Sequence, residues 1–67
     1  MYKNNIKTLL EQRDMTAYKL AKLTGISRQR LYPLVNAQEL PSGTHLGTLR
    51  LIANALGVGV GDLEVIE

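Results

Sequence analysis

The chain of 67 residues contains no cysteine, tryptophan or phenylalanine, and its only histidine is His45. Without cysteine there can be neither a disulfide framework nor a thiolate zinc site, and one histidine alone does not make a metal site. Apolar runs extend over only a few residues, so the sequence predicts neither a membrane span nor a signal peptide. These absences favour a cytoplasmic protein that works without a cofactor or a metal.

Residue types that often carry catalysis are present, but they form no recognisable catalytic pattern. Ser27 has no base partner that is visible in the sequence, and the carboxylates form no recognisable acid–base pair. The alternating glycines of residues 57–61 follow an expected helix and lack the strand-turn-helix context of a dinucleotide-binding motif. We therefore expect no enzymatic activity.

What the chain does contain suits one small folded unit. Hydrophobic residues make up 45% of the sequence and charged residues 21%, which is enough apolar surface to support a compact fold. A chain of this length buries only about 60% of the surface that its unfolded form exposes, so little core is left for an active-site cavity. We expect a single domain over residues 1–67, with a short C-terminal tail at 64–67.

Charge is distributed unevenly along the chain. Residues 1–36 hold seven basic and two acidic residues, a net charge of +5, whereas residues 37–67 hold one basic and four acidic residues, a net charge of −3. This division predicts a basic side that attracts phosphate. An ordinary solvated surface is the alternative interpretation.

The spacing of apolar residues predicts helices over residues 6–13, 17–24, 28–36 and 45–56, and a short fifth turn over 59–63 that docks Leu63 on the core. The expected inward faces are Ile6, Leu9 and Leu10; Ala17, Leu20, Ala21 and Thr24; Leu31, Leu34 and Val35; and Leu46, Leu49, Ile52, Ala53 and Leu56. The expected N-caps are Thr16, Ser27 and Thr44, and Gly25 and Gly57 are expected to end helices. Residues 36–45 are dense in turn formers and predict a surface loop.

The stretches TAYKLAKLTGISRQRLYPLVN and TLRLIANALGVGVGDL together resemble the Cro and phage-repressor type of helix-turn-helix proteins, the Xre-like regulators. The positions that carry the resemblance are Leu20, Ala21, Gly25, Ile26, Leu31, Leu34, Thr48, Leu49, Ile52, Ala53, Leu56, Gly57 and Leu63. The resemblance implies an all-α, compact five-helix, lambda-repressor-like DNA-binding domain with its helix-turn-helix motif at about residues 16–36. Such domains place the second helix of the motif in the major groove and bind paired half-sites as dimers.

The resemblance also implies base contacts by Arg28 and Gln29, and groove or backbone contacts by Arg30 and Asn36. Arg28 can donate two hydrogen bonds to guanine, and the amide of Gln29 can pair with adenine. Two arginines in the first turn of a helix oppose its dipole, which is easier to understand if phosphates or base acceptors lie opposite them. We expect base contacts from Arg28, Gln29, Tyr32 and Pro33, and DNA-backbone contacts from Thr16, Lys19, Ser27, Arg30 and Asn36.

Two positions depart from the family pattern. Ala17 stands where relatives often have a glutamine that braces the first recognition residue, which leaves Thr16 and Lys19 as the candidates to replace this brace. Pro33 lacks an N–H group and biases Tyr32 away from helical geometry, so we expect the helix to kink near Tyr32 and to tip its ring outward. The proline ring itself can meet a thymine methyl group.

These features predict a sequence-specific regulator of transcription that binds double-stranded DNA, and specifically a repressor in a phage-like control circuit. No sensing domain is expected, so its occupancy of DNA would respond to concentration. A homodimer would use the fourth helix, the fifth helix, or Val65 and Ile66 of the tail. The alternative function is an antitoxin or adaptor that uses the same fold to bind a protein partner such as a toxin.

Overall fold

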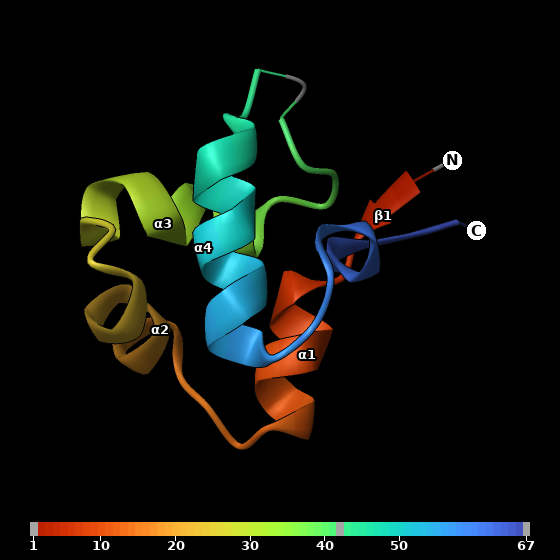
Figure 1. Cartoon of the computed structure of the whole chain (residues 1–67). Helices are drawn as coiled ribbons and strands as arrows, with labels where there is room; N and C mark the ends of the chain where they lie inside the picture. Colours follow the sequence, from red (N-terminus) through yellow and green to blue (C-terminus); the bar gives the residue numbers. More distant parts are fainter. Residues whose placement is uncertain (1, 42, 67) are drawn as a thin grey trace.

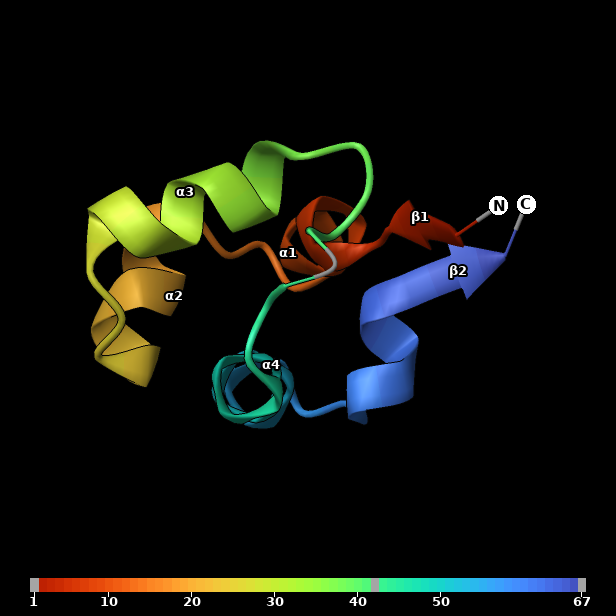
Figure 2. The same ribbon diagram turned by 90° about the horizontal axis from the view of Figure 1, so that it is seen from above.

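The computed structural model describes residues 2–41 and 43–66, in which four α-helices accompany a small two-stranded sheet (Figure 1). The helices are α1 (Ile6–Gln12), α2 (Ala17–Thr24), α3 (Arg28–Asn36) and α4 (Leu46–Leu56), followed by the 3₁₀ turn η1 (Val60–Leu63). Strands β1 (Tyr2–Asn4) and β2 (Glu64–Ile66) pair antiparallel, with Tyr2 opposite Ile66. The helices α2 and α3 lie at one end of the molecule, and the sheet lies at the other (Figure 2).

The expectation of an all-α fold with five helices is correct only in part. The four long helices are present, but the fifth segment is the 3₁₀ turn η1, from which Leu63 docks into the core as expected. The tail pairs with β1 as strand β2, where Val65 and Ile66 remain exposed, Ile66 over 75% of its surface. A three-residue strand carries almost no periodic signal, and its partner lies at the other end of the chain.

The core lies between the helices and is built from side chains that the periodicity indicated. Its buried apolar members are Ile6, Leu9, Leu10, Leu20, Ala21, Ile26, Leu31, Leu34, Val35, Ile52, Ala53, Leu56 and Leu63. Three further expected members, Ala17, Thr24 and Leu49, are partly buried. Leu46 was expected to face inward but is 52% exposed, because it stands in the first turn of α4, at the border of the buried face.

Three of the predicted helix ends are confirmed. Thr16 caps α2, and its Oγ1 accepts a hydrogen bond from the backbone N–H of Lys19 at 3.1 Å. Gly25 and Gly57 end α2 and α4 with φ of 74° and 72°, a left-handed conformation that favours glycine. Gly25 thereby provides the sharp turn that α2 and α3 need in order to pack against each other.

Two of the predicted caps are wrong. Ser27 stands at the N-cap position of α3, but its side chain makes no capping hydrogen bond. The N-cap residue of α4 is His45, one position later than expected. The hydroxyl of Thr44 instead donates to the carbonyl of Pro41 at 2.7 Å, so this side chain stabilises the preceding turn rather than the helix.

A buried asparagine holds two helix ends together. Asn4 is 8% exposed, and its Nδ2 donates to the carbonyl oxygens of Leu34, in the last turn of α3, and of Ala37, just beyond it. Its Oδ1 accepts a hydrogen bond from the N–H of Ile6, the first residue of α1, at 3.0 Å. Such helix-terminal groups have no partner within their own helix. One amide therefore satisfies both helices and fixes the end of α3 against α1.

Aspartate in place of Asn4 keeps the size of the side chain but removes both of its donors. We expect Asn4→Asp to lower the free energy of unfolding by about 3 kcal/mol, because two carbonyl groups lose their partners and face a buried carboxylate. The matched control is Asn5→Asp, which removes an exposed hydrogen bond to the Asp62 carbonyl and should cost less than about 1 kcal/mol. Urea unfolding followed by circular dichroism measures both variants. Equal losses would show that Asn4 has no special role in holding α3.

Candidate nucleic-acid interface

The orientation of α3 about its own axis decides which of its side chains are accessible. Its buried face consists of Leu31, Leu34 and Val35, as predicted. Successive residues of an α-helix are rotated by about 100°, so Gln29 and Pro33 lie on the opposite, exposed side. The same rotation puts Arg28 and Arg30 on the two flanks of Gln29. The first turn of α3 thus presents an amide in the middle and a guanidinium group on each side.

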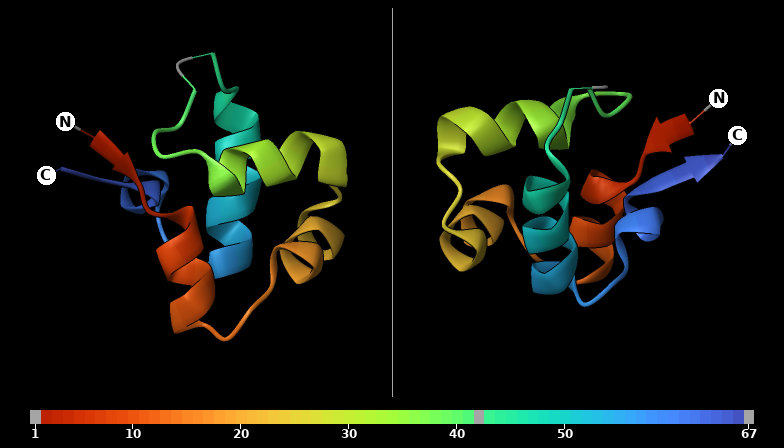
Figure 3. Two further views of the ribbon diagram at one scale, coloured as in Figure 1. Left: turned by 180° about the vertical axis from the view of Figure 1, so that it is seen from behind. Right: turned by 45° about the horizontal axis from the view of Figure 1, so that its top comes forward.

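The four residues that we predicted to contact bases are brought together. Arg28, Gln29, Tyr32 and Pro33 line one surface hollow. Three of them are exposed, whereas Tyr32 is partly buried and packs against the core. Figure 3 shows α3 lying across one side of the molecule, with α2 next to its first turn.

The effect of Pro33 on the helix differs from our expectation. The helix α3 is continuous from Arg28 to Asn36, so Pro33 does not end it, and Tyr32, whose ring we expected to tip outward, is partly buried and packs against the core. Burial of the apolar face on both sides of Tyr32 outweighs the local bias that proline imposes. Pro33 cannot donate to the Gln29 carbonyl, but Gln29 is exposed, so water can satisfy that group. At the end of α3, the N–H of Ala37 donates to the Pro33 carbonyl at 3.1 Å.

The side chain beside Arg28 is Tyr18, which comes from α2. The guanidinium carbon of Arg28 lies 5.9 Å from the centre of the Tyr18 ring, and Nζ of Lys22 lies 4.9 Å from it. We expected Thr16 or Lys19 to brace Arg28, and the structure places a different residue there. The spacing of Tyr18 and Lys22, four positions apart on one side of α2, indicates their mutual contact, but nothing in the sequence indicates the contact with Arg28.

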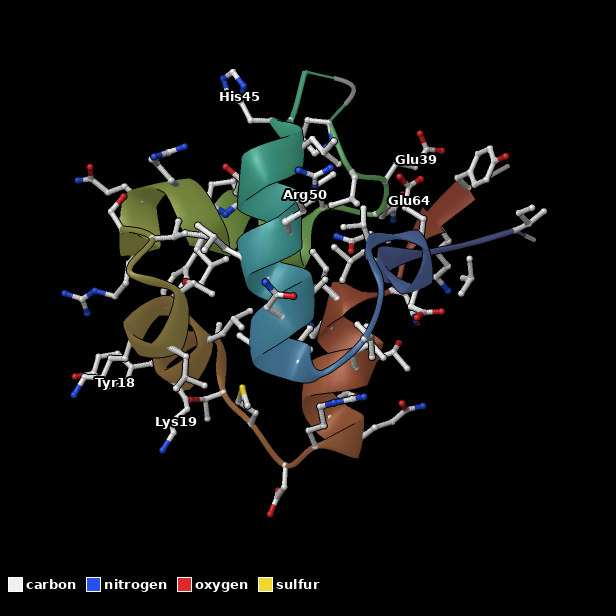
Figure 4. All side chains as sticks on the ribbon, viewed as in Figure 1. Tyr18, Lys19, Glu39, His45, Arg50 and Glu64 are labelled. Atoms are coloured by element: carbon white, nitrogen blue, oxygen red, sulfur yellow. The ribbon has the colours of Figure 1, made fainter. Side chains whose placement is uncertain are left out.

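The predicted backbone contacts of α2 lie at its N-terminal end. Thr16 and Lys19 line a second hollow, together with residues of the turn after α1. Because the Thr16 oxygen accepts the cap hydrogen bond, its hydroxyl proton can still be donated to a phosphate. Figure 4 shows Lys19 and Tyr18 projecting from the same end of the molecule.

The predicted backbone contacts of α3 are not among the residues that line the base-contact hollow. Arg30 lines a separate hollow with Thr44 and His45, on the side where α3 faces the start of α4. Ser27 and Asn36 are exposed at the two ends of α3. The structure therefore separates the candidate base contacts from the candidate phosphate contacts.

One of the basic residues in the first half of the chain serves the fold. Arg13 donates through Nε to the carbonyl of Leu56, at the end of α4, and through a terminal nitrogen to the carbonyl of Leu9 at 3.4 Å. A cation at a helix C-terminus is favoured by the helix dipole. The exposed cations that the helix-turn-helix segment supplies are Lys19, Lys22, Arg28 and Arg30.

The described ranges, 2–41 and 43–66, bring together no group of three or more histidine, aspartate or glutamate side chains suited to hold a metal ion. In the same part of the chain, each helix is too short or too polar to cross a lipid bilayer.

The comparisons with known proteins agree with the geometry of α2 and α3. No curated protein matches the chain. A family model described as the Cro/C1-type HTH DNA-binding domain matches residues 5–67, which extend from the start of α1 through β2. The tight turn at Gly25, the exposed side of α3 and the cations around it fit a DNA-binding domain of this type. The chain therefore belongs to the Cro/C1-type helix-turn-helix family, whose members bind double-stranded DNA and regulate transcription.

Proposed function

We propose that this protein is a sequence-specific repressor that reads the major groove with the first two turns of α3. The observation that carries this proposal is the single hollow formed by Arg28, Gln29, Tyr32 and Pro33 on the exposed side of α3. The major groove of B-DNA admits an α-helix, and each base pair presents a distinct pattern of donors and acceptors there. A domain that occupies those base pairs excludes other proteins from them, which is sufficient for repression.

The chemistry of each side chain suggests the base that it contacts. Arg28 can donate in parallel to O6 and N7 of guanine, and Gln29 can pair with N6 and N7 of adenine. Pro33 offers an apolar ring to a thymine methyl group. Tyr32 is held partly against the core, so it can contact a base at the bottom of the hollow without leaving its position.

The candidate phosphate contacts have suitable positions around this reading surface. The N–H groups in the first turn of α2 and the hydroxyl of Thr16 suit a phosphate oxygen. Lys19 adds a charge at the same helix end, and Arg30 adds one on the opposite flank. Ser27 and Asn36, at the two ends of α3, complete the proposed backbone contacts.

The proposal is tested by selecting duplexes from a randomised library and measuring fluorescence anisotropy on the selected sequences. We expect wild-type protein to recover a two-fold motif, and the double variant Arg28→Ala/Gln29→Ala to lose discrimination by about 1–3 kcal/mol for each lost bidentate contact. Arg30→Ala should weaken binding to all duplexes alike and reduce the slope of log affinity against log salt by about 0.9.

Arg50→Ala provides the matched control for charge. It removes the same group from α4, on the side where Glu64 lies and away from α2 (Figure 4), and should leave the salt slope nearly unchanged. If no motif is recovered, and weak binding is the same with and without Arg28 and Gln29, base readout by α3 is wrong. An antitoxin or adaptor that binds a protein partner would then be the better interpretation.

A separate prediction concerns the proline in the reading helix. We expect Pro33→Ala to retain the fold, because Pro33 is exposed and α3 is already helical through this position. The base preference of the variant should change at one base pair of each half-site, because the variant loses the apolar ring that we propose to contact the thymine methyl group. The measurement is the binding profile across single-base variants of the operator. An unchanged profile would show that Pro33 is merely tolerated in α3.

We further propose that two protomers bind the operator as a dimer, and that they contact each other through the end that carries the sheet. Tyr2 and Ile66 are opposite each other across the two strands, and both are exposed. Tyr2 also lines a hollow with Leu40, Leu49, Glu39 and Glu64, so a surface with both apolar and acidic side chains continues from the sheet toward α4. This end lies away from α2 and the first turn of α3 (Figure 2), and a second copy here leaves both reading helices available.

The dimer is tested by sedimentation of protein on operator duplexes. We expect two protomers per operator, with half-sites about one helical turn apart. Ile66→Lys should weaken the cooperativity of binding, because a two-fold interface brings the new charges of both copies together. Base discrimination within one half-site should stay the same. If the two half-sites fill independently, with no cooperativity at concentrations that saturate the operator, the dimer is contradicted.

A further inference from the structure

Tyr18 forms a contact between the two helices of the motif that the sequence pattern did not indicate. It lies in the first turn of α2, yet its ring is within 5.9 Å of the Arg28 guanidinium carbon at the start of α3. Tyr18 is 50% exposed, so half of its surface is covered even though it belongs to the outer side of α2. The ring therefore bridges the turn at Gly25.

The geometry points to a role for this ring, and we propose that Tyr18 is the positioning residue for Arg28, in place of the glutamine brace that this chain lacks. The inference rests on the proposed base readout by Arg28. A cation over an aromatic face is attracted by the ring quadrupole at distances up to about 6 Å. The arrangement restricts the guanidinium group without using any of its N–H donors. The donors that contact guanine O6 and N7 therefore remain available.

An aromatic brace also suits the charge of the surroundings. A carboxylate beside Arg28 would hold it through hydrogen bonds, but it would consume donors and repel DNA phosphates. The Tyr18 ring attracts two cations, Arg28 and Lys22, through its quadrupole and not through a negative charge. The positive charge of both side chains is therefore fully available to DNA.

The contact itself is tested in the protein without DNA. In wild-type protein we expect the Arg28 side-chain protons to show ring-current shifts in NMR spectra. Tyr18→Phe should retain these shifts, and Tyr18→Leu should abolish them. Leucine favours helices and Tyr18 is half exposed, so we expect Tyr18→Leu to fold, which its amide spectrum verifies. If the shifts are absent in wild type, or persist in Tyr18→Leu, the contact is refuted whatever the protein does with DNA.

The role in recognition is tested on operator duplexes that differ at the base pair read by Arg28. We expect Tyr18→Leu to lose about two- to fivefold in discrimination at that base pair, with the salt slope and the discrimination at the other base pairs unchanged. Tyr18→Phe should behave as wild type. Leu23→Ala is the control, because it alters another exposed side chain of the same helix.

The outcomes separate this inference from the proposed function. If wild type discriminates, Arg28→Ala abolishes that discrimination and Tyr18→Leu retains it in full, the positioning role is wrong and base readout by Arg28 stands. If Tyr18→Phe loses as much discrimination at that base pair as Tyr18→Leu does, the hydroxyl and not the ring is responsible, and the inference is also overturned. If wild type itself does not discriminate, the proposed function fails, and with it any role of Tyr18 in recognition.

Discussion

Burial of three apolar side chains on one face of α3 determines which of its residues face outward. Leu31 is completely buried, and Leu34 and Val35 nearly so, and together they fix the rotation of the helix against α1 and α2. With that rotation fixed, helical geometry alone places Gln29 and Pro33 outward. Because the core is small, a large part of it both stabilises the fold and sets which side of α3 is exposed. Stability and the composition of the reading surface are therefore consequences of the same packing.

The two ends of α3 are held by different kinds of interaction. At the N-terminal end, the left-handed Gly25 turns the chain and Ile26 anchors it in the core, so that end is fixed by conformation and apolar packing. At the C-terminal end, where Asn36 closes the helix, the side chain of Asn4 binds the final carbonyl groups. Pro33 removes a donor on the exposed side between these two ends, where water is available, and this explains why it is accommodated.

Local signals predicted much of the fold, and three features that they missed, the contacts of Asn4, the sheet and the Tyr18–Arg28 contact, depend on partners in other elements. Thr16 and Gly25 act within one or two turns of their position, so their residue types were sufficient to predict α2. Asn4 bonds to carbonyl groups at least 30 residues away, and strands of three residues pair from opposite ends of the chain; neither has a periodic pattern. The candidate base contacts followed from the phase of α3 and the family resemblance. Tyr18 was missed because its contact depends on how α2 crosses α3.

The distribution of charge lets the molecule be oriented before any base is contacted. The helix-turn-helix end holds four exposed cations, Lys19, Lys22, Arg28 and Arg30, while Glu39 and Glu64 lie toward the sheet (Figure 4), to which Lys3 also belongs. The phosphate backbone of DNA attracts the helix-turn-helix end more strongly than the sheet end, and it does so over about 8 Å at physiological salt, which is farther than any hydrogen bond reaches. A carboxylate brace for Arg28 would weaken this attraction at the place where it matters most. The ring of Tyr18 does not, so restricting the guanidinium group and attracting phosphate are compatible in this fold.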